Sequence, residues 1–172
     1  IVHHMQNRIG INTGQMVTGN MGSDSRMNYT MMGDTVNLAA RLESSAKQYG
    51  IYIQIADSTY ESVKDQVVIR ALDFVKVMGK EEPVKVYELI SEVGQEPEPY
   101  KKILPAFHEA IAYYFNQDWD KAIDAFKAAD DLEEMFPGRK TNPSRIYIPR
   151  CEHFKVNPPG DDWDGVWTHT SK

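Results

Sequence analysis

The pattern of residues changes at segment 93–100, and this change constrains the fold more than any other feature of the sequence. Before it, short runs rich in β-branched and aromatic residues alternate with segments whose apolar residues have helical spacing. This interleaving is typical of a mixed domain, which we predict over residues 1–92. The segment itself holds a glycine and two prolines close to three glutamates, which predicts a linker.

Residues 101–157 have a different character, because their apolar residues keep helical spacing throughout. We predict two helices joined by a short turn, and a third helix that begins at Pro143. Proline is favoured in the first turn of a helix, and Asn142 or Ser144 is suited to cap it. A C-terminal tail over residues 158–172 follows this helical extension.

Within the first part, one helix is predicted from Asp34, a suitable N-cap, to a stop at Gly50. Its apolar positions have helical spacing and are expected to face the core: Leu38, Leu42, Ala46 and Tyr49. Strands are expected over 8–17 (with a turn near Thr13), 51–55, 67–77 and 84–90. A loop is predicted from Gly19 to Ser25.

The composition is that of a soluble globular protein, with 41% hydrophobic and 26% charged residues. The net charge of −6, without a basic stripe, argues against nonspecific nucleic-acid binding. The single cysteine, Cys151, excludes an internal disulfide and a thiolate metal cluster, and favours a reducing, cytoplasmic setting. No apolar run approaches the ~20 residues of a spanning helix, so we predict no membrane contact by this segment.

Asn37 and Arg41 are the most informative polar residues of the predicted helix. They are four residues apart, so their side chains stack on one face, offset from Leu38 and Leu42. An amide and a guanidinium on one rigid face can bind a sugar oxygen and a phosphate together. From the spacing alone, the ordinary alternative is favoured: a solvated helix face, with Arg41 paired to a nearby glutamate.

The sequence around these two residues changes that interpretation. Several pieces of the chain, and the spacing between them, closely resemble the class III nucleotide cyclases. These pieces are Gly10-Ile11-Asn12-Thr13-Gly14, Gly19, Tyr29, the run from Gly33 to Glu43, Gly79-Lys80 and Val86-Tyr87. The resemblance covers residues 8–90, and it implies an α+β, ferredoxin-like sheet of βαββαβ order.

The resemblance also implies a mechanism, in which two catalytic domains pair and form active sites at their interface. One domain supplies two metal-binding aspartates; the other supplies an asparagine that orients the ribose and an arginine that steadies the phosphate in the transition state. Asn37 and Arg41 fall on the latter two positions. The implied reaction is attack of the ATP 3′-oxygen on the α-phosphate, with two Mg²⁺ or Mn²⁺ ions, to give cyclic AMP and pyrophosphate.

Thr30 falls at the position with which the family reads the purine. Many bacterial adenylate cyclases resemble this chain in having threonine there, whereas guanylate cyclases usually have cysteine. A hydroxyl can accept a hydrogen bond from the adenine amino group, so it suits adenine. We therefore favour ATP over GTP, with a strand threonine bonded to backbone as the alternative.

Two departures from the family pattern bear on the site. The metal-binding aspartates lie upstream in the family, and no residue before Arg8 matches them, so the metal ligands are expected outside this chain. Where the family often has a lysine for the triphosphate, this sequence has Met78. Lys80 or Lys76 is then the candidate for binding the phosphates, with a solvated hairpin lysine as the alternative for each.

The first two helices of the extension resemble a tetratricopeptide repeat. The positions that match its second helix are Trp119, Ala122, Phe126 and Ala129. One repeat cannot bury its own apolar face, so it is expected to pack on the N-terminal part, on the third helix or on a second chain. Residues 144–167 also resemble tails that follow the catalytic domain in some bacterial membrane-anchored receptor cyclases.

Three hypotheses for function follow. The first is an adenylate cyclase whose activity belongs to a homodimer of the parent protein, with this fragment inactive alone. The second is a regulatory module that dimerises without chemistry, favoured by Met78 and opposed by the intact Asn37 and Arg41. The third is a protein-interaction module over residues 101–157. Because the chain opens with Ile1, we expect a longer parent with a sensor and membrane segments upstream of a cytoplasmic catalytic region.

Overall fold

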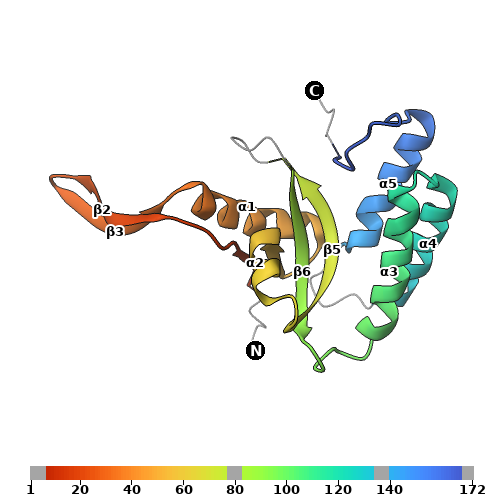
Figure 1. The fold of residues 1–172 in the computed structure, drawn as a ribbon, viewed down its shortest axis with the longest axis horizontal. Coiled ribbons are helices and arrows are strands. Elements are labelled where there is room, and N and C mark those ends of the chain that lie inside the picture. The colour runs from red at the N-terminus through yellow and green to blue at the C-terminus, as the bar shows by residue number, and fades with distance from the viewer. Residues whose placement is uncertain (1–6, 77–82, 134–139, 168–172) are drawn as a thin grey trace.

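The computed structural model describes residues 7–76, 83–133 and 140–167, and Figure 1 shows their arrangement. The strands are β1 (Ile9–Ile11), β2 (Val17–Ser23), β3 (Arg26–Met32), β4 (Ile53–Ala56), β5 (Val67–Val75) and β6 (Val84–Glu92). The helices are α1 (Asp34–Tyr49), α2 (Asp57–Val63), α3 (Tyr100–Phe115), α4 (Trp119–Leu132) and α5 (Pro143–Val156). Strands and helices alternate as far as β6, and only helices follow it in the described residues.

Four strands form one sheet in the order β1-β4-β6-β5. β6 pairs antiparallel with both β4 and β5, whereas β1 pairs parallel with β4, from Ile9 opposite Ile53 to Ile11 opposite Ile55. The parallel pair needs a crossover, which α1 provides. Helices α1 and α2 lie on one side of the sheet and α3 to α5 on the other (Figure 1). The predicted α+β class is confirmed.

Strands β2 and β3 form a separate hairpin that projects from the rest of the chain, and we call it the arm (Figure 1). They pair antiparallel from Val17 opposite Met32 to Ser23 opposite Arg26. The loop predicted from Gly19 to Ser25 is therefore wrong in extent, since only Asp24 and Ser25 turn. The glycines there are strand residues, and every residue of β3 is exposed.

Helix α1 packs its apolar stripe on the sheet, as its periodicity predicts. The buried residues of this core come from α1, the β4 region, β5 and β6: Leu38, Leu42, Ala46, Tyr49, Ile51, Ala56, Leu72 and Val86. Gly50 ends the helix in the left-handed conformation, at φ 66°, which glycine adopts without strain. The N-cap is Gly33, not Asp34 as predicted. Asp34 lies in the first turn, where its charge still favours the helix dipole.

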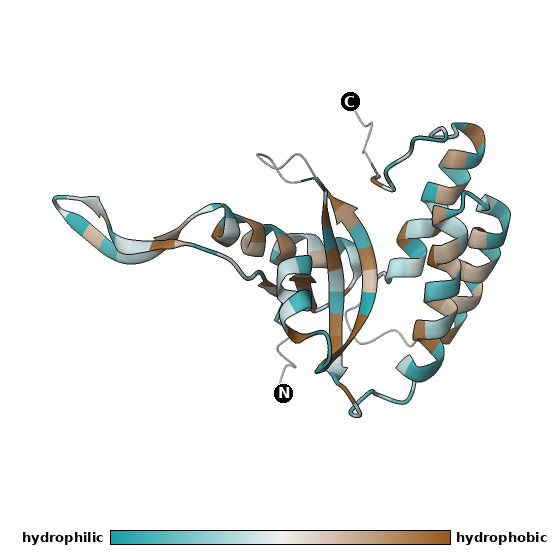
Figure 2. Cartoon of the chain, in the orientation of Figure 1, coloured by the Kyte–Doolittle hydropathy of each residue, from teal (hydrophilic) through white to brown (hydrophobic). Residues whose placement is uncertain are grey.

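The extension has its own core, built mainly from aromatic side chains. Its buried aromatic residues are Phe107, Tyr114, Phe126, Tyr147 and Phe154. The Phe126 and Tyr147 rings stack with centroids 4.9 Å apart, so the repeat-like helices pack directly on α5. Asn142 caps α5 by accepting a hydrogen bond from the Arg145 backbone at 3.1 Å, one of the two caps predicted. Figure 2 shows the hydrophobic residues gathered on the sheet and between the helices.

A buried cation, Arg70 of β5, joins the extension to the sheet. Its guanidinium donates to Glu88 on β6 and to Glu133 after α4, each at 2.5 Å. The Phe107 ring of α3 lies 5.0 Å from the guanidinium carbon. Two carboxylates and an aromatic face offset the cost of burying this charge. The helices of the extension are thus packed on the sheet as well as on one another.

Candidate functional site

Asn37 and Arg41 both lie on α1 with exposed side chains. Leu38 and Leu42, each one residue further along, are buried against the sheet. The helix therefore presents an amide and a guanidinium to solvent, one turn apart, while its other face is fixed in the core. In the described part of the chain no carboxylate forms an ion pair with Arg41. Both side chains are exposed, as the alternative of a solvated helix face also expects, so their roles stay predictions.

The loop after β1 holds the N-terminal half of α1 in place. Asn12 Nδ2 donates to the Thr35 carbonyl oxygen at 3.0 Å, and Asn12 Oδ1 accepts from Ser58 Oγ at 2.8 Å. One amide thus bridges α1 and α2. A Cβ at Gly10 would lie 2.1 Å from the Ala39 carbonyl oxygen, so only glycine permits this approach of β1 to α1. Sequence reasoning assigned Asn12 no role, although its place between two glycines at a strand end was a signal.

Thr30 lies on β3, in the arm, opposite Gly19 of β2. Its side chain is exposed, and a Cβ at Gly19 would meet no atom within 4 Å, so the surface beside Thr30 is open. No hydrogen bond among the described residues joins Thr30 to Asn37 or Arg41. The structure therefore places the three residues on two neighbouring elements, Thr30 on the arm and the other two on α1.

Of the two candidate lysines, only Lys76 lies within the described residues. Lys80 and Met78 lie outside the described residues. Lys76, at the end of β5, is mostly exposed, and its Nζ lies 3.8 Å from the Asp164 carboxylate. Lys76 thus has a partner in the C-terminal tail and none on α1.

The Val86-Tyr87 motif has a structural role in β6. Val86 is buried in the core, and the Tyr87 hydroxyl donates to Asp57 in the first turn of α2 at 2.6 Å. Burial, and then the hydrogen bond and charge of Asp57, raise the pKa of Tyr87, so its hydroxyl remains a donor. The motif therefore fixes α2 on the sheet.

Metal-binding side chains do not come together in the described ranges. No group of three or more His, Cys, Asp or Glu residues is placed to hold a metal ion there. The described residues therefore do not fit a divalent-cation site. No described helix is both long and apolar enough to cross a lipid bilayer.

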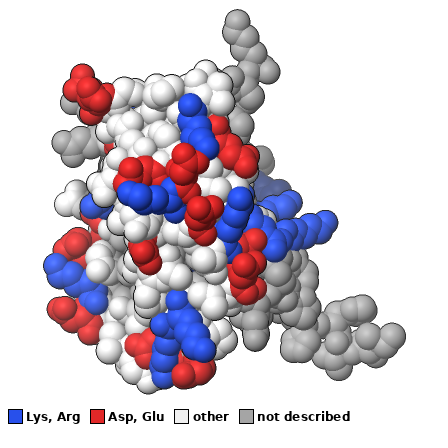
Figure 3. All heavy atoms as spheres, turned by 90° about the vertical axis from the view of Figure 1, so that its right-hand side faces the viewer, with Lys and Arg blue, Asp and Glu red and all other residues white. Residues whose placement is uncertain are grey.

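The arm beside the site carries a large exposed apolar surface. The side chains that form it are 53–74% exposed: Met16, Val17, Met27, Tyr29, Met31 and Met32. By the register of the arm, Met27, Tyr29 and Met31 lie on one of its faces and Val17 and Met32 on the other. Exposed apolar side chains gathered in this way mark an interaction site. The face formed by the extension differs, since Figure 3 shows acidic and basic side chains interspersed over it.

Comparison with known proteins gives one family. A family model described as the adenylate and guanylate cyclase catalytic domain matches residues 2–91. The terminal-differentiation specific adenylate cyclase of Dictyostelium discoideum is 37% identical over 147 residues, which are 83% of this chain and 7% of that protein. Adenylate cyclase 1 of Rhizobium meliloti is 40% identical over 86 residues, which are 50% of this chain and 13% of that protein.

Among solved structures, the adenylyl cyclase CyaB from P. aeruginosa is 37% identical, with a TM-score of 0.43 over 52% of this chain and 45% of that chain. The chain spans a small part of the length of the curated relatives it matches. Because the Dictyostelium match covers 83% of the chain, it reaches beyond residue 91 into the helical extension. Similarity to this relative is therefore not confined to the residues that the family model matches.

Proposed function

The chain belongs to the adenylate and guanylate cyclase catalytic domain family, and from this premise we propose that it is part of an adenylate cyclase. The reaction is conversion of ATP to 3′,5′-cyclic AMP and pyrophosphate, in signal transduction. The observation that carries the proposal is the pair Asn37 and Arg41, exposed one turn apart on a helix whose opposite face is buried. Neither side chain forms a hydrogen bond or an ion pair with another described residue.

Each of the two residues has a role suited to its chemistry. Asn37 offers a donor and an acceptor, and it orients the ribose so that its 3′-oxygen faces the α-phosphate. Arg41 donates to the phosphate oxygens, where negative charge develops in the transition state. Both act from a helix held at its N-terminal half by Asn12 and Gly10, which limits their movement.

Thr30 is proposed to read the purine from the arm. Its hydroxyl accepts a hydrogen bond from the adenine amino group, and the open surface beside Gly19 leaves room for a base. The two curated relatives described above are adenylate cyclases, which supports ATP over GTP. Lys80 is proposed to bind the phosphates, in place of the lysine that Met78 replaces.

A second cyclase domain is the proposed partner, in a homodimer that pairs across the exposed arm and α1. Two Mg²⁺ or Mn²⁺ ions, when bound, activate the nucleophile and neutralise phosphate charge. We place their ligands on residues outside this chain, because the described residues do not fit a metal site. On this proposal the chain alone is inactive, and the catalytic region is cytoplasmic in a membrane-anchored parent.

The test assays the parent protein, in which an upstream part supplies the metal-binding carboxylates, for cyclic AMP formation from ATP with Mn²⁺. Asn37→Ala and Arg41→Ala should each lower kcat by about 10²–10³-fold, as loss of a transition-state donor does. Lys47→Ala is the matched control, since Lys47 is an exposed cation in the last turn of the same helix. It should leave kcat unchanged.

Two outcomes would contradict the proposal. If the parent makes neither cyclic AMP nor cyclic GMP, the regulatory dimer module becomes the better account. If Lys47→Ala lowers kcat as much as Arg41→Ala, the loss reflects damage to the helix and not a catalytic role.

A further inference from the structure

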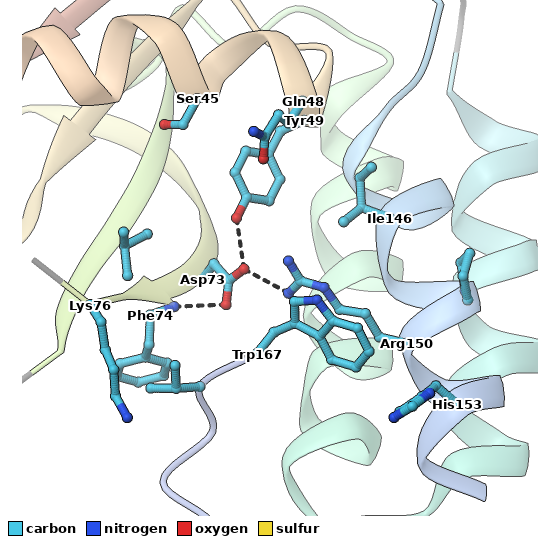
Figure 4. Close-up of a pocket in the computed structure, with 13 residues that line it drawn as sticks. Ser45, Gln48, Tyr49, Asp73, Phe74, Lys76, Ile146, Arg150, His153 and Trp167 are labelled. Atoms are coloured by element: carbon cyan, nitrogen blue, oxygen red, sulfur yellow. Dashed lines mark hydrogen bonds and ion pairs between the residues drawn. The ribbon is translucent and has the colours of Figure 1, made fainter. Parts of the chain in front are cut away.

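The C-terminal end of α1 is joined to the extension through one carboxylate, that of Asp73 on β5. Tyr49 Oη donates to Asp73 Oδ2 at 2.7 Å, and Arg150 of α5 donates to the same oxygen at 2.6 Å (Figure 4). The other oxygen accepts from the Phe74 backbone at 2.8 Å. We call Tyr49, Asp73 and Arg150 the Asp73 bridge. It connects α1, the sheet and α5 at a single point.

The Asp73 bridge is buried, so its bonds are strong and costly to break. Tyr49, Asp73 and Arg150 are 5%, 8% and 9% exposed. Burial, and then the charge of Asp73, raise the pKa of Tyr49, so its hydroxyl keeps its proton and remains a donor. Burial lowers the pKa of Arg150, but the charge and hydrogen bond of Asp73, together with Tyr147 and Tyr49, raise it overall. Removing one member leaves another polar group buried without its partner.

Three further contacts connect α1 and the sheet to α5 and to Thr141, which lies two residues before α5. A Cβ at Gly50, the C-cap of α1, would lie 1.9 Å from the Thr141 carbonyl oxygen, so the backbone leading into α5 lies directly on the helix end. Ile146 of α5 packs on the core that α1 shares with the sheet. The Tyr147 hydroxyl donates to the Leu72 carbonyl oxygen of β5. Helix α5 therefore contacts the sheet and the end of α1 together.

A hollow of about 980 Å³ lies beside the bridge, between α1, β5, α5 and the C-terminal tail. It is lined by Gln48 of α1 and by His153 and Pro149 of α5, so these two helices are not in continuous contact (Figure 4). The connection from the extension to α1 thus consists of the Asp73 bridge, the Gly50 contact and the packing of Ile146. Loss of the bridge would leave room for α1 and α5 to shift relative to one another.

The N-terminal half of α1 carries Asn37 and Arg41. Arg41 precedes Tyr49 by eight residues, which is about 12 Å along a helix. A helix transmits a displacement of one end to the other because its backbone hydrogen bonds keep it rigid over this length. We propose that Asp73, Tyr49 and Arg150 are positioning residues, through which the C-terminal extension fixes α1 and sets the placement of Asn37 and Arg41. This inference rests on the function proposed above.

The test compares Tyr49→Phe, which removes only one hydroxyl, with Arg150→Ala and the double variant in the full parent protein. Each single change should lower kcat by roughly 10-fold or more, with a smaller change in KM, because small misplacements of catalytic groups cost on that scale. The double variant should lose no more than the worse single change, since both break the same bridge. Arg150→Lys keeps a cation opposite Asp73 and should retain more activity than Arg150→Ala.

The reactivity of the Cys151 thiol distinguishes a loss of positioning from unfolding of the variant. Its thiol is fully buried in α5, and burial raises its pKa to about 12, so it reacts with an alkylating reagent only when α5 opens. Mass spectrometry of the peptide that contains Cys151 measures this opening in each variant. A lower kcat with Cys151 still protected supports the inference. An unchanged kcat in Tyr49→Phe overturns it, as does a loss of kcat that scales with alkylation of Cys151.

Arg145→Ala is the matched control, because it breaks an ion pair of α5 with Asp130 inside the extension. It should leave kcat unchanged, and a loss equal to that of Arg150→Ala overturns the inference. An inactive wild-type parent overturns the proposed function and this inference with it. An active wild type, sensitive to Arg41→Ala but not to changes in the bridge, overturns the inference alone.

Discussion

The extension and the N-terminal part differ in how far their large apolar side chains are buried. The extension buries its aromatic residues in one core, with Tyr114 within ring contact of Phe154, Trp119 and Trp163. The N-terminal part instead exposes large apolar side chains: of the twelve that are exposed in the described residues, eight lie between Ile9 and Met32. The apolar side chains of the extension thus pack within the described chain, whereas those of the arm are exposed to solvent there.

The largest effect should come from truncating an aromatic residue in each part. Phe126→Ala removes a fully buried ring of the extension and should lower the free energy of unfolding by about 3–5 kcal/mol. Tyr29→Ala removes a ring that is 74% exposed on the arm. It should change the free energy of unfolding by less than about 0.5 kcal/mol. Denaturant unfolding of each variant measures the difference. Equal losses would mean that the arm is packed in solution and that the contrast is false.

A substitution in the arm should weaken association of the chain although it changes the free energy of unfolding little. Tyr29→Asp places a charge in the apolar surface of the arm and should weaken self-association of the chain by about 10- to 100-fold, on the scale of an interface hot spot. Sedimentation over a range of protein concentrations measures this. Glu109→Lys, an exposed change on α3, is the control and should have no effect. A wild-type chain that stays monomeric at high concentration would contradict the prediction.

The sequence predicted the elements that are buried in the chain's own core better than the exposed arm. The apolar positions of α1 were predicted because a helix packed on one side leaves a strong period of 3.6. The arm was missed because Gly19, Gly22 and the Ser-Asp-Ser turn are loop signals, and an exposed hairpin has no buried face to produce alternation. Local patterns of apolar residues record burial in the chain's own core, and the residues of β3 have no such burial.

For the site, spacing predicted that Asn37 and Arg41 share a face of α1, and both are exposed there. The roles of these residues and of Thr30 stay predictions. The Asp73 bridge could not be predicted, because Asp73 and Arg150 are 77 residues apart and no local pattern marks either as buried. A charged residue on a strand or a helix is usually solvated, and only tertiary packing shows that these two meet.

High pH should destabilise the extension and its contact with α1. Burial raises the pKa of Cys151 from 9.0 to about 12, and burial also raises the pKa of Tyr49, Tyr114 and Tyr147. The folded state therefore keeps protons that the unfolded state releases. The stabilisation is complete below pH 9.0 and is lost as pH rises toward 12, by up to about 1.4 kcal/mol per pH unit for the thiol.

Denaturant unfolding between pH 8 and pH 10 measures this loss. Cys151→Ala should show a shallower decline above pH 9.0, since the thiol no longer contributes, while the tyrosines still do. A stability that rises over this range would reverse the predicted sign and would mean that the thiol is ionised in the folded chain.

The smallest effect concerns the N-cap of one helix in each part, α5 in the extension and α1 in the N-terminal part. Asn142 caps α5 with its side chain and also donates to Asp130 at 2.5 Å, so Asn142→Ala should lower stability by about 1–2 kcal/mol, and Asn142→Ser should recover part of it. Helix α1 begins at Gly33, with no side-chain cap and a φ of 144°. Gly33→Ser should therefore destabilise, because the strain of a side chain at this φ outweighs a new cap. If Gly33→Ser raises the midpoint of unfolding instead, α1 is limited by capping, and the two parts begin their helices by the same rule.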